Sequence, residues 1–117
     1  MTRHPMAPVA ALLSLLLAGC SAPPAPGVWI AEPGGEADYS RLSVEYDGRA
    51  ELFIPEQEAA LLRCFWRAAS TQGILLQCAY AERERQEVFY DFRIDPDGGA
   101  TLSRDDRSLA RFRRQPR

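Results

Sequence analysis

The residues that could carry chemistry in this chain of 117 residues are carboxylates, arginines and three cysteines. Four aspartates crowd the late turns, at Asp95, Asp97, Asp105 and Asp106. Paired carboxylates can transfer protons or bind calcium. Their spacing does not match an EF-hand loop, and aspartate is a common turn residue. We therefore interpret these four residues as turn formers.

Histidine chemistry is excluded from the mature chain. The one histidine, His4, lies in an amino-terminal segment that we expect to be removed. Without it the chain has no Ser/His/Asp or Cys/His nucleophile and no HExxH zinc site. No CxxC pair is present to bind a metal. We predict a protein that is not an enzyme and has no metal or cofactor. The formal net charge of −2 does not favour nucleic-acid binding.

The carboxyl-terminal segment is rich in arginine. Guanidinium groups bind phosphates through forked hydrogen bonds, so Arg111, Arg113 and Arg114 are candidate contacts for an envelope polyanion such as lipopolysaccharide. The alternative, which the sequence favours, is a solvated terminal segment that keeps the domain soluble.

The first twenty residues have the pattern of a secretory signal. An apolar run from 6 to 17 is too short to span a bilayer. It ends in Leu17-Ala18-Gly19-Cys20, which resembles the lipobox of bacterial lipoproteins. The resemblance implies removal of residues 1–19 and acylation of Cys20. With Ser21 after the cysteine, it also implies a lipid anchor in the outer membrane, facing the periplasm. An ordinary signal peptide that ends near a cysteine is the alternative.

Behind the signal we expect a short tether and one small domain. Residues 20–26 comprise the lipidated cysteine and a proline- and alanine-rich stretch, and the domain spans 27–117. Cys64 and Cys78 form an even pair once Cys20 carries lipid. Because the periplasm is oxidising, we predict a disulfide between them.

Alternation of apolar and polar residues predicts strands joined by tight turns. The alternation before Asp47-Gly48 predicts a hairpin with a three-residue turn, in which Val44 faces Ala50. The alternation from 88 to 94 and the turn Pro96-Asp97-Gly98 predict a second hairpin.

Residues 55–69 fit two structures. Pro55, the acids after it and the following alanines and leucines suit the start of a helix. The alternation from Leu62 to Ala68 suits a strand. We favour strands, and a short helix near residues 55–62 is the alternative.

The whole pattern predicts an all-β domain. It is an antiparallel meander of about eight short strands, closed or nearly closed into a small barrel. The segment Gly27-Val28-Trp29 resembles the first strand of lipocalin-like barrels, whose last strand supplies an arginine that packs on the tryptophan. The resemblance implies that Arg111 or Arg113 is the arginine that packs on Trp29, and that the barrel binds a small lipophilic ligand. So few short strands enclose an interior that side chains alone can fill. We expect core positions for the aromatic residues Trp29, Trp66, Tyr80, Tyr90 and Phe92.

The alternation continues from 74 to 80, which predicts a central hairpin of residues 62–68 and 74–80, and Phe65 and Leu75 fall on its face opposite Cys64 and Cys78. An apolar patch there predicts a partner surface, unless residues 31–39 cover it. Two functions remain open. The domain is a protein-binding module for an envelope protein, of the assembly-factor or inhibitor type, or a lipocalin-like binder of a small lipophile.

Overall fold

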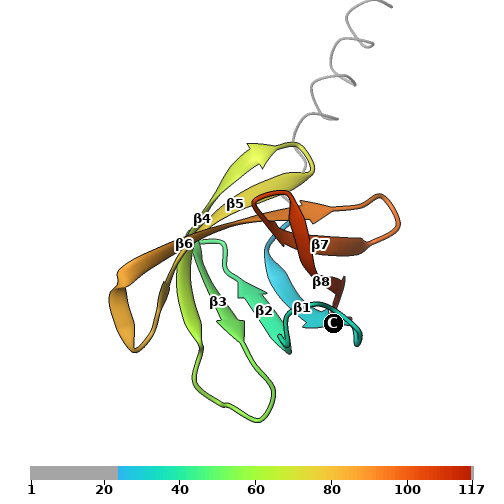
Figure 1. Ribbon diagram of the computed structural model, residues 1–117. Helices are drawn as coiled ribbons and strands as arrows, with labels where there is room; N and C mark the ends of the chain where they lie inside the picture. The colour runs from blue at the N-terminus through green and yellow to red at the C-terminus, as the bar shows by residue number, and fades with distance from the viewer. Residues whose placement is uncertain (1–23, 117) are drawn as a thin grey trace, which may run out of the picture.

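The computed structural model describes residues 24–116, so the predicted signal segment and Cys20 lie outside it. These residues form eight antiparallel strands paired in chain order, and the last pairs with the first to close a barrel (Figure 1). The strands are β1 (Gly27–Ala31), β2 (Arg41–Val44), β3 (Arg49–Phe53), β4 (Leu62–Ser70), β5 (Gly73–Tyr80), β6 (Arg83–Ile94), β7 (Gly99–Arg104) and β8 (Arg107–Arg114). The predicted all-β antiparallel meander is confirmed, and the barrel is closed.

The β2–β3 turn has the predicted three-residue geometry. The Glu45 amide donates to the Arg49 carbonyl at 2.9 Å, and Val44 pairs with Ala50. Gly48 has a φ of 96°, a left-handed conformation that favours glycine. Gly98 in the β6–β7 turn adopts the same left-handed conformation, with a φ of 90°. Both hairpins therefore keep their apolar residues on the inner face.

The alternative of a short helix near residues 55–62 is wrong. Residues 54–61 form a loop, in which Glu56 has a φ of 68° that is incompatible with a right-handed helix. The Leu61 amide donates to the Leu52 carbonyl at 2.9 Å. Because this amide is bonded to β3, it cannot take part in the hydrogen bonds of a helix. Within residues 24–116, no helix is long and apolar enough to cross a membrane.

Side chains fill the interior of the barrel. Trp29, Phe92 and Phe112 are fully buried and pack edge to face, with ring centroids 5.1 Å and 5.8 Å apart. Leucines surround these rings, and each has a relative exposure of 0%. They are Leu42, Leu52, Leu62, Leu76 and Leu102. Of the other predicted core aromatics, Tyr90 is buried, whereas Trp66 and Tyr80 are only partly buried.

The two ends of the barrel differ. One, here called the amino-terminal end, carries residues 24–26 and the turns β2–β3, β4–β5 and β6–β7. Ala25 is 1% exposed there, and its carbonyl accepts a hydrogen bond from the Trp29 indole at 2.9 Å. The last residues of the predicted tether thus pack against the barrel. The other end, here called the open end, carries the loops 32–40 and 54–61 and the turns β5–β6 and β7–β8.

Candidate binding surfaces

The predicted disulfide is present and orients the central hairpin. Cys64 and Cys78 are bonded across β4 and β5, and both side chains lie inside the barrel at 4% and 1% exposure. Because alternate residues of a strand point to opposite faces, Phe65 and Gln77 point outward beside them. The disulfide therefore fixes which residues of this hairpin face the solvent.

The outer face of β4, β5 and β6 carries two exposed phenylalanines. Phe65 on β4 is 70% exposed, and Phe89 on β6 is 49% exposed. Both are register partners of Gln77 on the central strand β5. The two rings therefore stand on strands about 10 Å apart. Leu75 and Ala79 lie two residues to either side of Gln77 and are partly buried.

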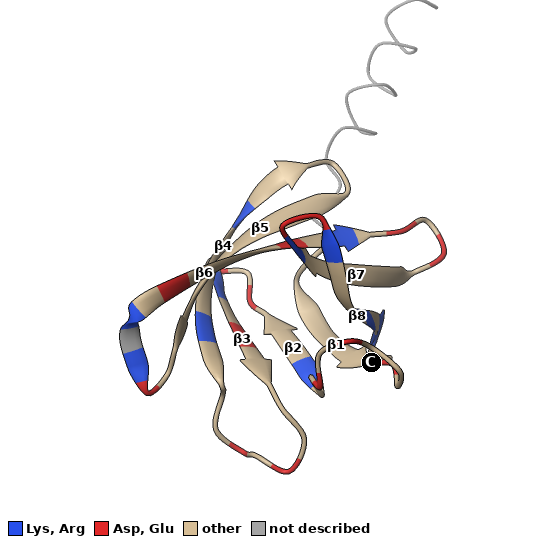
Figure 2. Cartoon of the chain, in the orientation of Figure 1, with Lys and Arg blue, Asp and Glu red and all other residues tan. Residues whose placement is uncertain are grey.

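In the three rows of this outer face that centre on Gln77, β4 carries basic residues and β6 carries acidic residues, whereas Arg93 lies on β6 beyond Asp91. Arg63 and Arg67 flank Phe65 on β4, and Glu87 and Asp91 flank Phe89 on β6. Figure 2 shows basic bands along β4 and both acidic and basic bands along β6, where Arg83, Arg85 and Arg93 lie to either side of the acidic residues of the face. In the part of the chain that the structure describes, Arg63, Arg67 and Asp91 have no ion-pair partner within 4.0 Å. We call the following nine residues the β4–β6 face: Arg63, Phe65, Arg67, Leu75, Gln77, Ala79, Glu87, Phe89 and Asp91.

The structure places the predicted residues Phe65 and Leu75 on this face and adds Phe89, which sequence analysis missed. The strand alternation around Phe89 already pointed its side chain outward, but nothing local indicated that β6 lies beside β5. Residues 31–39, the segment that was expected as an alternative to cover this face, pack against β8 instead. The Glu32 and Ala37 amides donate to carbonyls of β8, at 2.7 Å and 2.9 Å. Phe65 therefore remains uncovered.

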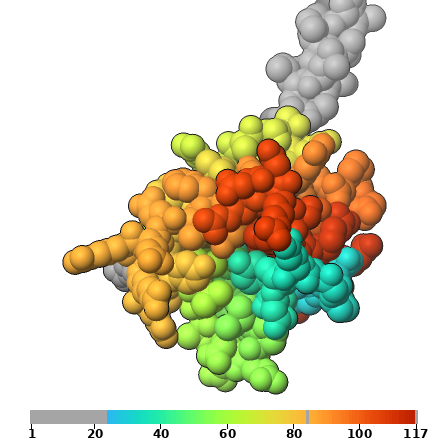
Figure 3. Space-filling model, viewed as in Figure 1, coloured from blue at the N-terminus to red at the C-terminus, as the bar shows by residue number. Residues whose placement is uncertain are grey.

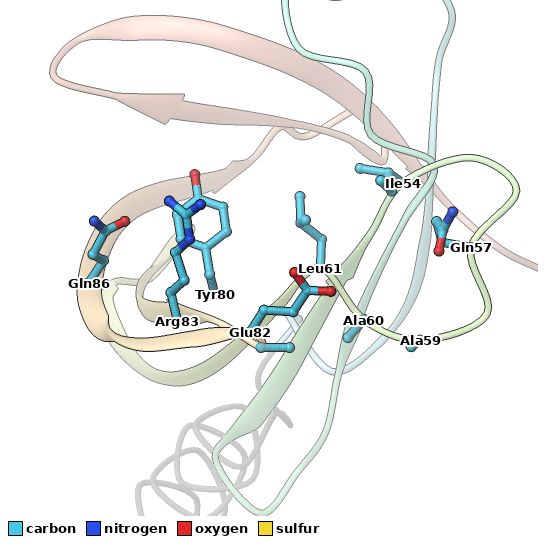
Figure 4. Close-up of a pocket in the computed structure, with 10 residues that line it drawn as sticks. Ile54, Gln57, Ala59, Ala60, Leu61, Tyr80, Glu82, Arg83 and Gln86 are labelled. Carbon is cyan, nitrogen blue, oxygen red and sulfur yellow. The ribbon is translucent and has the colours of Figure 1, made fainter.

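A cleft of about 610 Å³ opens at the open end, between the 54–61 loop and the β5–β6 turn. Both segments project from the barrel in the space-filling view (Figure 3). Figure 4 shows Tyr80 and Arg83 on one side of the cleft, Ile54 and Gln57 on the other, and Leu61 between them. The cleft lies at the rim of the barrel, beside the packed core.

Two further tyrosines, Tyr39 and Tyr90, line an adjacent hollow that shares Tyr80 with this cleft. The hydroxyls of Tyr39 and Tyr90 are 3.2 Å apart, which is within hydrogen-bonding distance. Burial, followed by the hydrogen bond with Tyr39, raises the pKa of Tyr90 far above its ordinary value. The Tyr90 hydroxyl is therefore neutral at physiological pH and acts as a hydrogen-bonding group.

The candidate anion-binding arginines all contact groups within this chain. Arg111 donates to the Asp95 carboxylate at 2.6 Å, which raises the pKa of the arginine, and Arg113 pairs with Glu32 at 2.7 Å. The guanidinium of Arg114 covers the ring of Trp29. The arginine on the tryptophan is thus Arg114.

The assignment of that contact to Arg111 or Arg113 is wrong, for a reason of strand parity. The buried residues Ala110 and Phe112 mark the inner positions of β8, so the residues at 111 and 113 project outward. Arg114 continues the inner parity where the barrel ends, and it pairs with Trp29 in the β1–β8 register. A terminal residue on the inner side can therefore fold over the indole.

The four aspartates of the late turns have local structural partners or turn conformations. Asp95 accepts from Arg111, and Asp97 accepts from the Gly99 amide at 2.9 Å. Asp105 and Asp106 have φ values of 52° and 63° in the β7–β8 turn. Among residues 24–116, no three His, Cys, Asp or Glu side chains gather closely enough to hold a metal ion.

No known protein family, curated protein or solved structure matches this chain.

Proposed function

We propose that this protein is a non-enzymatic lipoprotein, anchored in the bacterial outer membrane through Cys20 and facing the periplasm, whose barrel is a protein-binding module. The β4–β6 face is the binding surface. The observation that carries this proposal is the exposure of Phe65 and Phe89 on one face, at 70% and 49%. The barrel buries its other phenylalanines, Phe53, Phe92 and Phe112.

Exposed phenylalanine rings supply a driving force for binding. Removing a side chain of this size from water yields about 1.5–3 kcal/mol. Aromatic residues surrounded by polar groups are typical of the centre of protein interfaces. The arginines of β4 and the acids of β6 form the rim and orient the partner by charge. The face therefore combines an apolar centre with charge-based specificity.

The predicted anchor lies close to the domain. Residues 21–23 separate Cys20 from Pro24, whose carbonyl accepts a hydrogen bond from Arg114. Four residue steps span at most about 14 Å. An acylated Cys20 therefore holds the amino-terminal end of the barrel at the membrane. The β4–β6 face, which lies on the side wall of the barrel, stays accessible.

Site-specific photo-crosslinking tests the proposal in the producing bacterium. A benzophenone amino acid replaces Phe65 or Phe89 in the full chain, and Ile30 in the control. Ile30 is 41% exposed on β1, which is not part of the face. We expect a discrete protein adduct from positions 65 and 89 and none from position 30. No adduct, or the same adduct from all three positions, would overturn the proposal.

The open-end cleft supports a second function, the binding of a small lipophilic molecule. Its volume is about 610 Å³, and Ile54, Leu61 and Tyr80 form the apolar part of a lining that also contains polar and charged side chains. The test is a native mass spectrum of residues 21–117 secreted to the periplasm. A reproducible extra mass of a few hundred daltons that disappears in a Leu61→Glu variant would support this function. A chain without bound ligand would contradict it.

A further inference from the structure

We infer that the partner of the β4–β6 face is a second copy of this chain, related to the first by a two-fold axis parallel to β5. This inference rests on the proposed function, because it names the partner of the same face. It follows from the charges of the face, which has basic residues on β4, acidic residues on β6 and neutral residues on β5 between them.

The β4–β6 face is built of three rows that cross the strands. In each row a residue of β4 and a residue of β6 are register partners of the same residue of β5. The rows are Arg67–Leu75–Asp91, Phe65–Gln77–Phe89 and Arg63–Ala79–Glu87. The outer rows thus run from a basic to an acidic residue, and the middle row has a phenylalanine at both ends.

A two-fold axis parallel to β5 places residues of opposite charge on the two copies opposite each other. It places β4 of one copy over β6 of the other and keeps each row over its equivalent. Arg67 then faces Asp91 of the second copy, and Phe65 faces Phe89 of the second copy. Arg63 faces Glu87 of the second copy in the same way. Each neutral residue of β5 faces its own equivalent on the axis, and every contact between β4 and β6 occurs twice.

The other face-to-face arrangement brings like charges together. A two-fold axis across the strands would place β4 over β4 in the opposite direction. Arg67 would then face Arg63 of the second copy, and Glu87 would face Asp91 of the second copy. Such juxtapositions are unfavourable at an interface. The charges of the face therefore favour one of the two arrangements.

The same axis suits attachment to one membrane. The β4–β5 turn and Pro24 lie at the amino-terminal end of the barrel. An axis parallel to β5 leaves the amino-terminal ends of both copies on the same side, so that both Cys20 anchors enter one membrane. The axis across the strands would direct the two anchors in opposite directions.

Tethering also compensates for the small size of the face. Three strands and three rows cover about 300 Å² of sheet, whereas a stable complex buries about 800 Å² per partner. Confinement to one membrane raises the effective concentration of the second copy. The dimer therefore forms at the membrane and dissociates readily in dilute solution.

Complementary charge reversals test the pairing in the full lipidated chain. Two copies with different carboxyl-terminal tags are produced together, treated with a chemical crosslinker in intact cells, and purified through one tag. Wild-type copies should co-purify. The Arg67→Glu chain should lose at least about tenfold in co-purification with itself, and so should the Asp91→Arg chain. Each would place two pairs of like charges across the axis.

Mixing the two variants is the decisive step. A dimer of one Arg67→Glu copy and one Asp91→Arg copy has opposite charges at both contacts, so co-purification should return to the wild-type level. Arg104→Glu, at the open end, is the control and should co-purify with itself like the wild type. Circular dichroism of each variant checks that the barrel is folded.

The dimer and the proposed function can fail separately. Absence of co-purification between wild-type copies, or failure of the mixed pair to recover, would overturn the dimer. A photo-adduct at Phe65 with the mass of two copies supports the dimer. An adduct with a different protein overturns the dimer as the occupant of this face but leaves the proposed function standing. Absence of any adduct overturns both.

Discussion

The guanidinium carbon of Arg114 lies 4.3 Å from the centre of the Trp29 ring, where β8 ends beside β1. The same guanidinium donates hydrogen bonds to the carbonyls of Pro26, at 2.6 Å, and Pro24. One side chain thus joins the last strand, the first strand and the segment that leads to the predicted lipid anchor.

Removal of this side chain should loosen the amino-terminal end. We expect Arg114→Ala to lower the free energy of unfolding by about 1–2 kcal/mol, because a cation–π contact and hydrogen bonds are lost. Urea denaturation followed by tryptophan fluorescence measures the change. Arg113→Ala removes only an exposed ion pair with Glu32 and should cost less than about 1 kcal/mol. Equal losses in the two variants would contradict the assigned role.

The disulfide should contribute a large part of the stability. Replacing both Cys64 and Cys78 with alanine opens a loop whose ends are separated by 14 residues. In the chain-entropy model this lowers the free energy of unfolding by about 3 kcal/mol. Denaturation of the double variant beside the oxidised wild type measures the loss. Alanine is the suitable replacement because both positions are buried. An unchanged denaturation midpoint would refute the prediction.

Two phenylalanines of opposite exposure should respond differently to truncation. Phe92 is 0% exposed and contacts Trp29 and Phe112, so Phe92→Ala should cost about 3–5 kcal/mol. Phe65 is 70% exposed, so Phe65→Ala should change stability by less than about 0.5 kcal/mol. Thermal unfolding of both variants compares them. A strongly destabilised Phe65→Ala protein would show that this ring serves folding instead of binding.

The β2–β3 turn offers a test of backbone strain. Gly48 has a φ of 96°, and apart from its two chain neighbours no residue lies within 4 Å of the position that a Cβ would take. Gly48→Ala should therefore cost about 1–2 kcal/mol through conformation alone. Gly48→Asn should cost less, because asparagine tolerates left-handed conformations better. Urea denaturation of the two variants gives the order, and an alanine variant as stable as wild type would exclude strain at this turn.

The sequence alone was sufficient for features that depend on one strand or one hairpin. Period-two alternation and the Asp-Gly turns predicted the strands around Gly48 and Gly98 and their register. The parity of the central hairpin predicted that Cys64 and Cys78 lie on the same face. These features depend on residues close together in the chain, whose turn geometry and side-chain alternation leave few other arrangements.

Features that join distant segments could not be predicted in the same way. The 54–61 loop is not helical because pairing of Leu61 with Leu52 takes its end into the barrel. Arg114, and not Arg111 or Arg113, covers Trp29 because barrel closure sets β8 beside β1. In each case the local pattern allowed two outcomes, and a partner in another strand decided between them.

The β4–β6 face shows the same division. The sequence determined that Phe65 and Phe89 each point away from the inner face of their own strand. Only the tertiary structure placed them in one row, because strand order and the β5–β6 register bring both beside Gln77. The opposed charges of β4 and β6 likewise form a pattern only once the sheet aligns them. Side-chain direction is a local property of each strand, whereas the neighbours across a sheet are set by the fold as a whole.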